Sequence, residues 1–342
     1  MQPSGKTPEP ELSGARVLVT GGTGFTGTNL LRKLVGRHDV DVCGIARPSS
    51  QIPADLKDAV TWYRGDVYDA TVVARAMKGV RYVFHLAACF REPGAADEEY
   101  WNVHVQSTQL LAEAAVREPG FRRFVHISTI GVHGHIERPP ANENAPYNPG
   151  DVYQRTKLEG EQWIRAFAAA NTLPLVVVRP AQIMGPSDRR LVKLCKLATY
   201  GICPLLDGHL TRLHFVHVDD LTDCLILCAH HPRAEGEVFI CGTPEPTNLV
   251  DTVNEVGRLL GRGVWFIPVP SGPLFLITDI VEYISDVLGV EPILFRRRLA
   301  FFTKDRSFDT RKVRERLGFS CQYDTVDTIR DTVRGYVRKG WL

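Results

Sequence analysis

The chain of 342 residues lacks the features that mark several classes of protein. Its eight cysteines include no CxxC pair and no regular spacing, which argues against a disulfide framework and against a cysteine zinc site. No apolar run reaches the roughly 20 residues that a membrane-spanning helix needs. The most apolar region, from Val264 onward, is broken by prolines at 268, 270 and 273. A net charge of +2 gives no electrostatic footprint for nucleic acid.

These absences predict where the protein is located and what it binds. Free thiols predict a reducing compartment, so the cytoplasm is the expected location. Residues 1–12 are polar and proline-rich, unlike a signal peptide, and are expected to form a flexible tail. We expect no metal, since no HExxH motif occurs. A small molecule is the expected partner, and peripheral contact of the region around Val264 with a membrane surface stays open.

The first half of the sequence alternates short apolar segments with stretches of helical periodicity. The apolar segments include residues 15–21, 40–47 and 82–88. Strands joined through helices pair in parallel by crossover connections. The pattern therefore predicts an α/β fold with a Rossmann-type, doubly wound parallel sheet and a smaller C-terminal substrate-binding domain. We assign the sheet domain to residues 13–185 and 211–243, and the substrate-binding cap to residues 186–210 and 244–342.

Glycines cluster where the first predicted strand becomes a helix. The stretch VLVTGGTGFTGTNLL, residues 17–31, places them at 21, 22, 24 and 27. Glycine permits positive φ and the close approach of another backbone or a ligand. The helix N-terminus adds N–H donors and a dipole that favours anions. The turn predicts a site for the pyrophosphate of a dinucleotide, with a tight turn that binds nothing as the alternative.

The end of the second predicted strand bears on which dinucleotide is bound. An acidic residue there would bind the ribose 2′-hydroxyl of NAD. The sequence instead offers Ala46 and Arg47, followed by Ser49 and Ser50. Arg47 suits a 2′-phosphate, so NADP is slightly favoured over NAD, with an exposed loop arginine as the alternative reading.

The stretch YQRTK spaces a phenol and an ammonium group one helical turn apart. Tyr153 and Lys157 stand at positions i and i+4 and would share one face of a helix. A cation there lowers the pKa of a phenol, which makes Tyr153 a candidate proton donor and acceptor at a carbonyl or carbinol. Ser128 and Thr129, at the end of an earlier predicted strand, are placed to orient the same oxygen.

Taken together, the motifs resemble those of the extended short-chain dehydrogenase/reductase family in order and approximate spacing. They are TGGTGFTG, GDVYD, HLAA, NVHVQSTQLL, ISTIGVHG, YQRTK, RPAQIMGP and FVHVDD. The resemblance covers residues 13–245, and RSFDTRKVRERLGF resembles the usual C-terminal close of the family. The family includes NAD-dependent epimerases and dehydratases and enzymes like 3β-hydroxysteroid dehydrogenase.

The resemblance implies roles for individual residues. It implies that Tyr153 and Lys157 are catalytic and also hold the nicotinamide-side ribose. Thr129, rather than Ser128, would bind the substrate oxygen, and Asn102 matches a helix asparagine near the active site. Besides Arg47, the implied cofactor contacts are Gly21, Gly24, Phe25, Thr26 and Gly27 at the pyrophosphate, Asp66 and Val67 at the adenine, Leu86, Ala87 and Ala88 at the ribose, and Pro180 and Ile183. Phe90, His133 and Gln182 are expected at the substrate.

The resemblance is compatible with two enzymatic branches and with one binding function. One branch comprises dehydrogenases and reductases of sterols, steroids and dihydroflavonols, and the other comprises nucleotide-sugar epimerases and dehydratases that regenerate NAD within each turnover. Leu213 stands where the second branch commonly has an arginine, and Gln182 stands where it usually has an asparagine. We therefore favour net hydride transfer between nicotinamide and a secondary alcohol or ketone. A non-catalytic dinucleotide sensor is the third reading, and the family also implies a homodimer.

Overall fold

A seven-stranded parallel sheet organises the larger part of the protein. The computed structural model describes residues 12–37, 39–90, 96–208, 211–274, 278 and 305–342. The strand order is β11–β6–β5–β4–β1–β2–β3, and every neighbouring pair is parallel. The strands are β1 (Arg16–Thr20), β2 (Asp41–Ala46), β3 (Thr61–Arg64), β4 (Val80–His85), β5 (Arg123–Ile127), β6 (Leu175–Pro180) and β11 (Val238–Cys241). The predicted doubly wound sheet is confirmed, and its direction of winding reverses between β1 and β4, where such sheets form a crevice.

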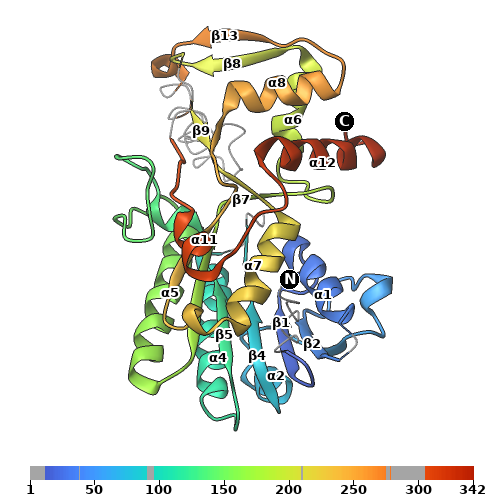
Figure 1. The fold of residues 1–342 in the computed structure, drawn as a ribbon, viewed down its shortest axis with the longest axis vertical. Coiled ribbons are helices and arrows are strands. Elements are labelled where there is room, and N and C mark those ends of the chain that lie inside the picture. The colour runs from blue at the N-terminus through green and yellow to red at the C-terminus, as the bar shows by residue number, and fades with distance from the viewer. Residues whose placement is uncertain (1–11, 38, 91–95, 209–210, 275–277, 279–304) are drawn as a thin grey trace, which may run out of the picture.

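Helices cover both faces of this sheet (Figure 1). One face is covered by α1 (Phe25–Val35), α7 (Val218–His230) and α11 (Arg311–Leu317), whose leucines and valines form one core with the strands. The opposite face is covered by α2 (Ala70–Ala76), α4 (Ser107–Ala115) and α5 (Val152–Asn171). β6 is buried along its whole length, which explains its almost continuous apolar sequence LVVVRP.

A smaller unit, the cap, lies above the sheet in Figure 1. It contains α6 (Val192–Tyr200), β8 (Ile202–Leu206), α8 (Leu249–Leu259), β13 (Trp265–Val269) and α12 (Thr325–Arg338). Side chains of α6, α8 and α12 form its separate core, and β13 runs parallel to β8. Two short strand pairs join the units: β7 (Gln182–Met184) with β10 (Phe215–His217), and β9 (Arg212–Leu213) with β12 (Thr247–Asn248). The remaining described helices are α3 (Asp97–Trp101), the π-helical segment Asn102–Gln106 and 3-10 turns at Ala54–Leu56, Ile130–His133 and Pro232–Ala234.

The division between the two units differs from the predicted one near the C-terminus. Residues 244–342 were expected in the cap, yet Val313 and Leu317 of α11, with Phe319, join the core of the large sheet. The apolar face of α11 packs there because β11 is an edge strand that needs a cover. The chain thus leaves the cap and returns to the sheet before α12 completes the cap core.

The cysteine thiols are free, in line with the irregular spacing of the cysteines in the sequence. All eight cysteines lie within the described residues and carry free thiols, and seven of them are buried. Across the described helices, none is long and apolar enough to cross a membrane. In the same part of the chain, no group of three or more His, Cys, Asp or Glu side chains is arranged to hold a metal ion.

The position of α5 is set by a backbone contact with the π-helical segment. Asp151 caps the helix, with its carboxylate accepting a hydrogen bond from Gln154 N at 2.8 Å. Farther along, Gly160 faces His104 so closely that a Cβ at Gly160 would lie 2.4 Å from the His104 carbonyl oxygen. The crossing therefore requires glycine, and it fixes the helical turn that carries Tyr153 and Lys157.

We predict that Gly160→Ala destabilises the protein although alanine is the better helix former. The added methyl group must push α5 away from the π-helical segment, at a cost of about 1–3 kcal/mol in the free energy of unfolding. Chemical denaturation measures the change. Gly263→Ala is the control, because a Cβ at Gly263 meets nothing within 4 Å. A Gly160→Ala variant that is more stable than the wild type would refute the close crossing.

Candidate active site

A cavity of about 880 Å³ lies beside the glycine turn and extends toward the cap. The sheet domain contributes Thr26, Leu86, Ala88, Phe90, Ser128, Thr129, Tyr153, Lys157 and Pro180 to its wall. Gln182, Ile183, Asp188, Arg190, Leu191, Arg306 and Phe308 also line it. The cavity therefore brings together residues that the sequence analysis assigned to cofactor, catalysis and substrate.

The glycine turn is folded tightly on itself between β1 and α1. Gly21 has φ of +69°, a backbone conformation that favours glycine, and its carbonyl oxygen accepts a hydrogen bond from Gly24 N at 3.0 Å. A Cβ at Gly27 would lie 2.1 Å from that same oxygen. Gly21 and Gly27 are thus required by the fold of the turn itself, whatever ligand it holds.

The N-terminus of α1 leaves its first N–H groups open to a ligand. Gly24 is the N-cap residue and has no side chain to accept from them, and the first turn contains no acidic residue. The first N–H groups of a helix have no acceptor within the helix, and its dipole favours an anion. Phe25 and Thr26 lie in this first turn, and Thr26 lines the cavity. These residues fit a pyrophosphate group.

Arg47 follows β2 on an exposed turn at the expected adenosine end of the site. Arg64 braces this turn by donating from Nη1 to the carbonyl oxygens of Arg47 and Ser50, at 3.1 and 3.0 Å. Asp66 and Val67 follow β3 and are half-buried. The pKa of Tyr68 is raised to about 12, chiefly by burial and by its hydrogen bond to Glu99; the charge of Asp66 also raises it and that of Arg47 lowers it. Arg47 and Asp66 therefore lie in one neighbourhood.

The residues after β4 alternate between the cavity and the interior. Leu86 and Ala88 line the cavity. Ala87 is buried in a small apolar cluster with Cys89 and Tyr100, and its N–H donates to Thr20 Oγ1 at 3.2 Å. The side chain of Ala87 thus supports the cavity wall from behind.

Tyr153 and Lys157 both line the cavity from α5, one turn apart as predicted. The Tyr153 ring lies edge-on to Phe90, with centroids 4.9 Å apart, and edge-on to His104 at 5.3 Å. Phe90 comes from the loop after β4 and His104 from the π-helical segment. The phenol ring is therefore held between two other rings.

Lys157 is a buried cation. It is 3% exposed, and its Nζ donates to the Ile127 carbonyl oxygen at 2.5 Å. Burial lowers its pKa from 10.5 to about 8, against the opposing charge of Glu161. Glu161 is itself engaged, because Arg179 donates to both of its carboxylate oxygens. The ammonium group is thus charged at neutral pH and close to losing its proton.

Three buried histidines near Lys157 are neutral. Burial, with the charge of Lys157 as the next cause, lowers the pKa of His85 to about 3 and that of His104 to about 2. The same two causes hold the pKa of His126 well below its usual range. His85 Nδ1 bonds Thr20 Oγ1 at 2.7 Å, and His104 Nδ1 bonds Thr156 Oγ1 at 2.7 Å. These imidazoles act as fixed polar groups that add no charge beside Lys157.

Two hydroxyl groups follow β5 at the cavity wall. Thr129 Oγ1 accepts a hydrogen bond from Gly131 N at 3.0 Å and caps the short 3-10 turn that follows. Ser128 is 2% exposed, and its Oγ has no hydrogen-bond partner among the described residues. Both residues are therefore available to a bound oxygen, and the preference for Thr129 stays a prediction.

The residues expected at the substrate separate into two groups. Phe90 and Gln182 line the cavity, together with Pro180 and Ile183, and within the described part of the chain Gln182 Oε1 has no hydrogen-bond partner. His133 is buried away from the cavity, where its Nε2 lies 3.0 Å from Arg179 Nη1 and its ring stacks on Tyr147. Asn102 begins the π-helical segment and is not among the residues that line the cavity.

Several cavity residues were not predicted as site residues from the sequence. Asp188 and Arg190 lie in the stretch GPSDRR, at the start of the segment assigned to the cap. Arg306 and Phe308 come from the segment before α11, more than a hundred residues later. His135 lines the cavity in place of His133, because Gly134 between them has φ of +58° and turns the chain.

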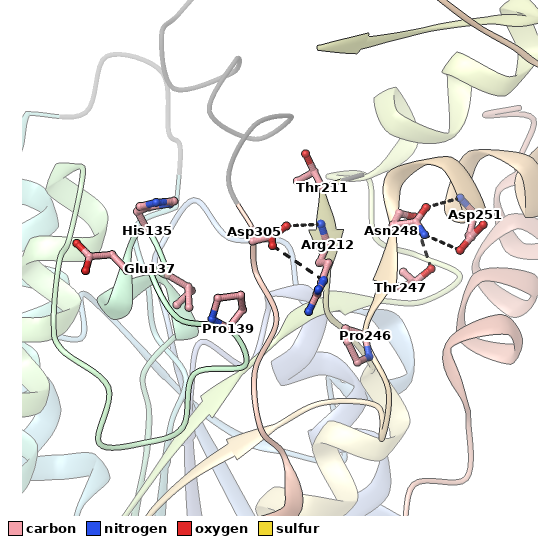
Figure 2. Close-up of a pocket in the computed structure, with 11 residues that line it drawn as sticks. His135, Glu137, Pro139, Thr211, Arg212, Pro246, Thr247, Asn248, Asp251 and Asp305 are labelled. Atoms are coloured by element: carbon pink, nitrogen blue, oxygen red, sulfur yellow. Dashed lines mark hydrogen bonds and ion pairs between the residues drawn. The ribbon is translucent and has the colours of Figure 1, made fainter. Parts of the chain in front are cut away.

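A second cavity, of about 700 Å³, adjoins the first at His135. Figure 2 shows it between the loop carrying His135, Glu137 and Pro139 and the strand pair β9 and β12, which joins the two units. Asp305 accepts a hydrogen bond from Arg212 N at 2.8 Å, and its other carboxylate oxygen lies 4.0 Å from Arg212 Nε. Asn248 and Asp251 line the side toward α8. The second cavity therefore extends the site toward the cap.

Comparison with known proteins gives a consistent result. The model of the NAD dependent epimerase/dehydratase family matches residues 17–242. UDP-glucose 4-epimerase of Vibrio cholerae is 29% identical over 290 residues, which cover 80% of this chain and 87% of that protein. 3 beta-hydroxysteroid dehydrogenase/Delta 5-->4-isomerase of Mycobacterium tuberculosis is 29% identical over 339 residues, which cover 94% of this chain and 90% of that protein. The crystal structure of gox2253 has a TM-score of 0.79 and 26% identity and covers 95% of this chain and 99% of that one.

We predict that the buried charge of Lys157 lowers the stability of the unliganded protein at neutral pH. Its pKa is lower in the folded protein than the unfolded value of 10.5, so the unfolded chain binds more protons between about pH 8 and 10.5. As the pH rises through that window, the free energy of unfolding of the wild type should increase by on the order of 3 kcal/mol relative to that of Lys157→Met. Denaturation at a series of pH values measures the difference. Lys193→Met, at an exposed position of α6, is the control. A difference between wild type and Lys157→Met that stays constant from pH 7 to 10 would refute the shift.

Proposed function

The chain belongs to the NAD dependent epimerase/dehydratase family, and from this premise we propose that it is an NAD(P)-dependent oxidoreductase acting on a secondary alcohol or ketone. The observation that carries the proposal is that Tyr153, Lys157 and Thr129 line one cavity with the first turn of α1. When bound, the nicotinamide cofactor supplies or accepts the hydride. The protein's own groups supply binding, orientation and proton transfer.

Tyr153 is the group that moves the proton. Its ring is held by Phe90 and His104, so its hydroxyl presents one position to a substrate oxygen. The ammonium group of Lys157, one turn along α5, favours the ionised phenol through its charge. Thr129 and Ser128 form hydrogen bonds with the same substrate oxygen and hold it within reach of the Tyr153 hydroxyl. Hydride is transferred at the substrate carbon, and Tyr153 transfers the proton at the substrate oxygen.

Net oxidation or reduction is favoured over nucleotide-sugar chemistry. Leu213, where the nucleotide-sugar branch commonly has an arginine, is fully buried in the cap core and offers no charge to a diphosphate. The neighbouring Arg212 lies beside Asp305 in the second cavity. The wall of the first cavity includes apolar side chains from Ile130, Ile183, Leu191 and Phe308. An apolar ketone or alcohol such as a sterol fits these features best.

NADP is the preferred cofactor in this proposal. Arg47 and Ser50 lie on the turn after β2 that Arg64 braces, and no acidic residue stands at that strand end. A guanidinium group there suits a 2′-phosphate. A homodimer and a cytoplasmic location stay predictions that rest on the family resemblance and on composition.

The proposal predicts stoichiometric oxidation of NADPH by an apolar ketone. The purified protein is first denatured to release any bound dinucleotide, which is identified by mass spectrometry. A separate, native sample is then assayed with sterols, simple ketones and nucleotide sugars in the presence of NADPH or NADH. We expect exchangeable cofactor and a lower KM for NADPH than for NADH. Tightly retained NAD with turnover of a nucleotide sugar would instead establish the epimerase or dehydratase branch. Dinucleotide binding without turnover of any compound would favour the sensor.

A further inference from the structure

Three cations line the main cavity, and they occupy different parts of it: Lys157, Arg190 and Arg306. Lys157 is held by the Ile127 carbonyl oxygen on the side of the sheet. Arg306 joins the cap, because its N–H donates to the Arg212 carbonyl oxygen at 3.0 Å. Arg190 lies in the loop between β7 and α6 and contacts the ring of Phe25, the first residue of α1.

The guanidinium group of Arg190 lies between the first residue of α1 and the loop after β4. Its Cζ is 5.9 Å from the centroid of the Phe25 ring and 5.6 Å from that of Phe90. The loop that carries it also approaches α1 directly, since a Cβ at Gly185 would lie 2.9 Å from Phe25 Cζ. Arg190 and Thr26, in the first turn of α1, line the same cavity. A cation from the predicted cap segment thus lies beside the Phe25 ring and shares the cavity with the first turn of α1.

Asp188 orients Arg190. Asp188 is 2% exposed, and its Oδ1 accepts hydrogen bonds from both N and Nε of Arg190, at 2.9 and 2.8 Å. The terminal nitrogens of Arg190 are less constrained, because the contact of Nη2 with the Ile183 carbonyl oxygen is long at 3.5 Å. A guanidinium group fixed at Nε presents its terminal N–H groups to an oxyanion in a defined direction.

We infer that Arg190 binds the pyrophosphate of the dinucleotide, with Asp188 as its positioning residue. The inference rests on the proposed function, which places a dinucleotide at the glycine turn. Uncharged N–H groups of α1 approach the phosphates from one side, and Arg190 supplies a positive charge from the other. Because Arg190 belongs to the loop leading into α6, the bound cofactor links the cap to the sheet domain.

Binding of ligand fragments tests this inference without relying on turnover. Isothermal titration calorimetry with ADP-ribose and with adenosine separates phosphate recognition from adenine recognition. For Arg190→Gln we expect the dissociation constant for ADP-ribose to rise about tenfold or more, because a charge-assisted contact is lost. We expect the effect to shrink in 1 M NaCl and the affinity for adenosine to stay unchanged. Arg190→Lys, which keeps the charge, should recover part of the affinity.

Arg189 provides a matched control one residue away. It is exposed, and its guanidinium group lies over the Trp341 ring at 4.6 Å, so Arg189→Gln removes the same charge without touching the cavity. We expect wild-type affinity for ADP-ribose in this variant. Asp188→Asn should weaken ADP-ribose binding, and it should add nothing in the Arg190→Gln background, since it acts through Arg190.

The outcomes separate this inference from the proposal on which it rests. Wild-type affinity for ADP-ribose in Arg190→Gln would overturn the role of Arg190 and leave the proposed function standing. The same affinity combined with a raised KM for the ketone would assign Arg190 to the substrate and also overturn the inference. A wild-type protein that binds neither ADP-ribose nor NADPH would overturn the proposed function itself, and the inference with it.

Discussion

The buried ammonium group of Lys157 is the charge on which the rest of the site depends. A cation at this depth is costly unless nearby polar groups compensate for the lost water. The Ile127 carbonyl oxygen provides one such group, and Glu161 provides a distant negative charge that is already paired with Arg179. The surrounding histidines stay neutral and do not compete with this charge. Of the three cations that line the cavity, Lys157 is the one on the same helix as Tyr153, one turn away, where a proton is expected to move.

Backbone geometry places that charge. The contact of Gly160 with the His104 carbonyl oxygen lets α5 approach the π-helical segment, and the same segment supplies the ring against which Tyr153 rests. At the other end of the cavity, Gly21 and Gly27 fold the turn before α1. None of these three glycines contributes a functional group. They instead determine how far apart the proposed pyrophosphate site and the proposed catalytic pair lie.

The sequence predicted the features that depend on local periodicity or on short spacings. The alternation of strands and helices follows from burial of a parallel sheet, and the pair Tyr153 and Lys157 follows from helical geometry, so both could be recognised. His133 was expected at the substrate, but the turn at Gly134 directs it to Arg179 and brings His135 to the cavity. Arg190 and the packing of α11 on the sheet depend on contacts between distant segments, for which the sequence shows no period.

The central claim is that Tyr153 transfers the proton in a redox reaction, and one substitution tests it most directly. Tyr153→Phe removes the hydroxyl group and keeps the ring that packs against Phe90 and His104. With NADPH and the ketone that the wild type reduces, we predict that the rate of hydride transfer falls about a thousandfold, within the range for loss of a general acid. The dissociation constant for NADPH should stay at the wild-type value. A Tyr153→Phe enzyme that transfers hydride at the wild-type rate would contradict the proposed mechanism.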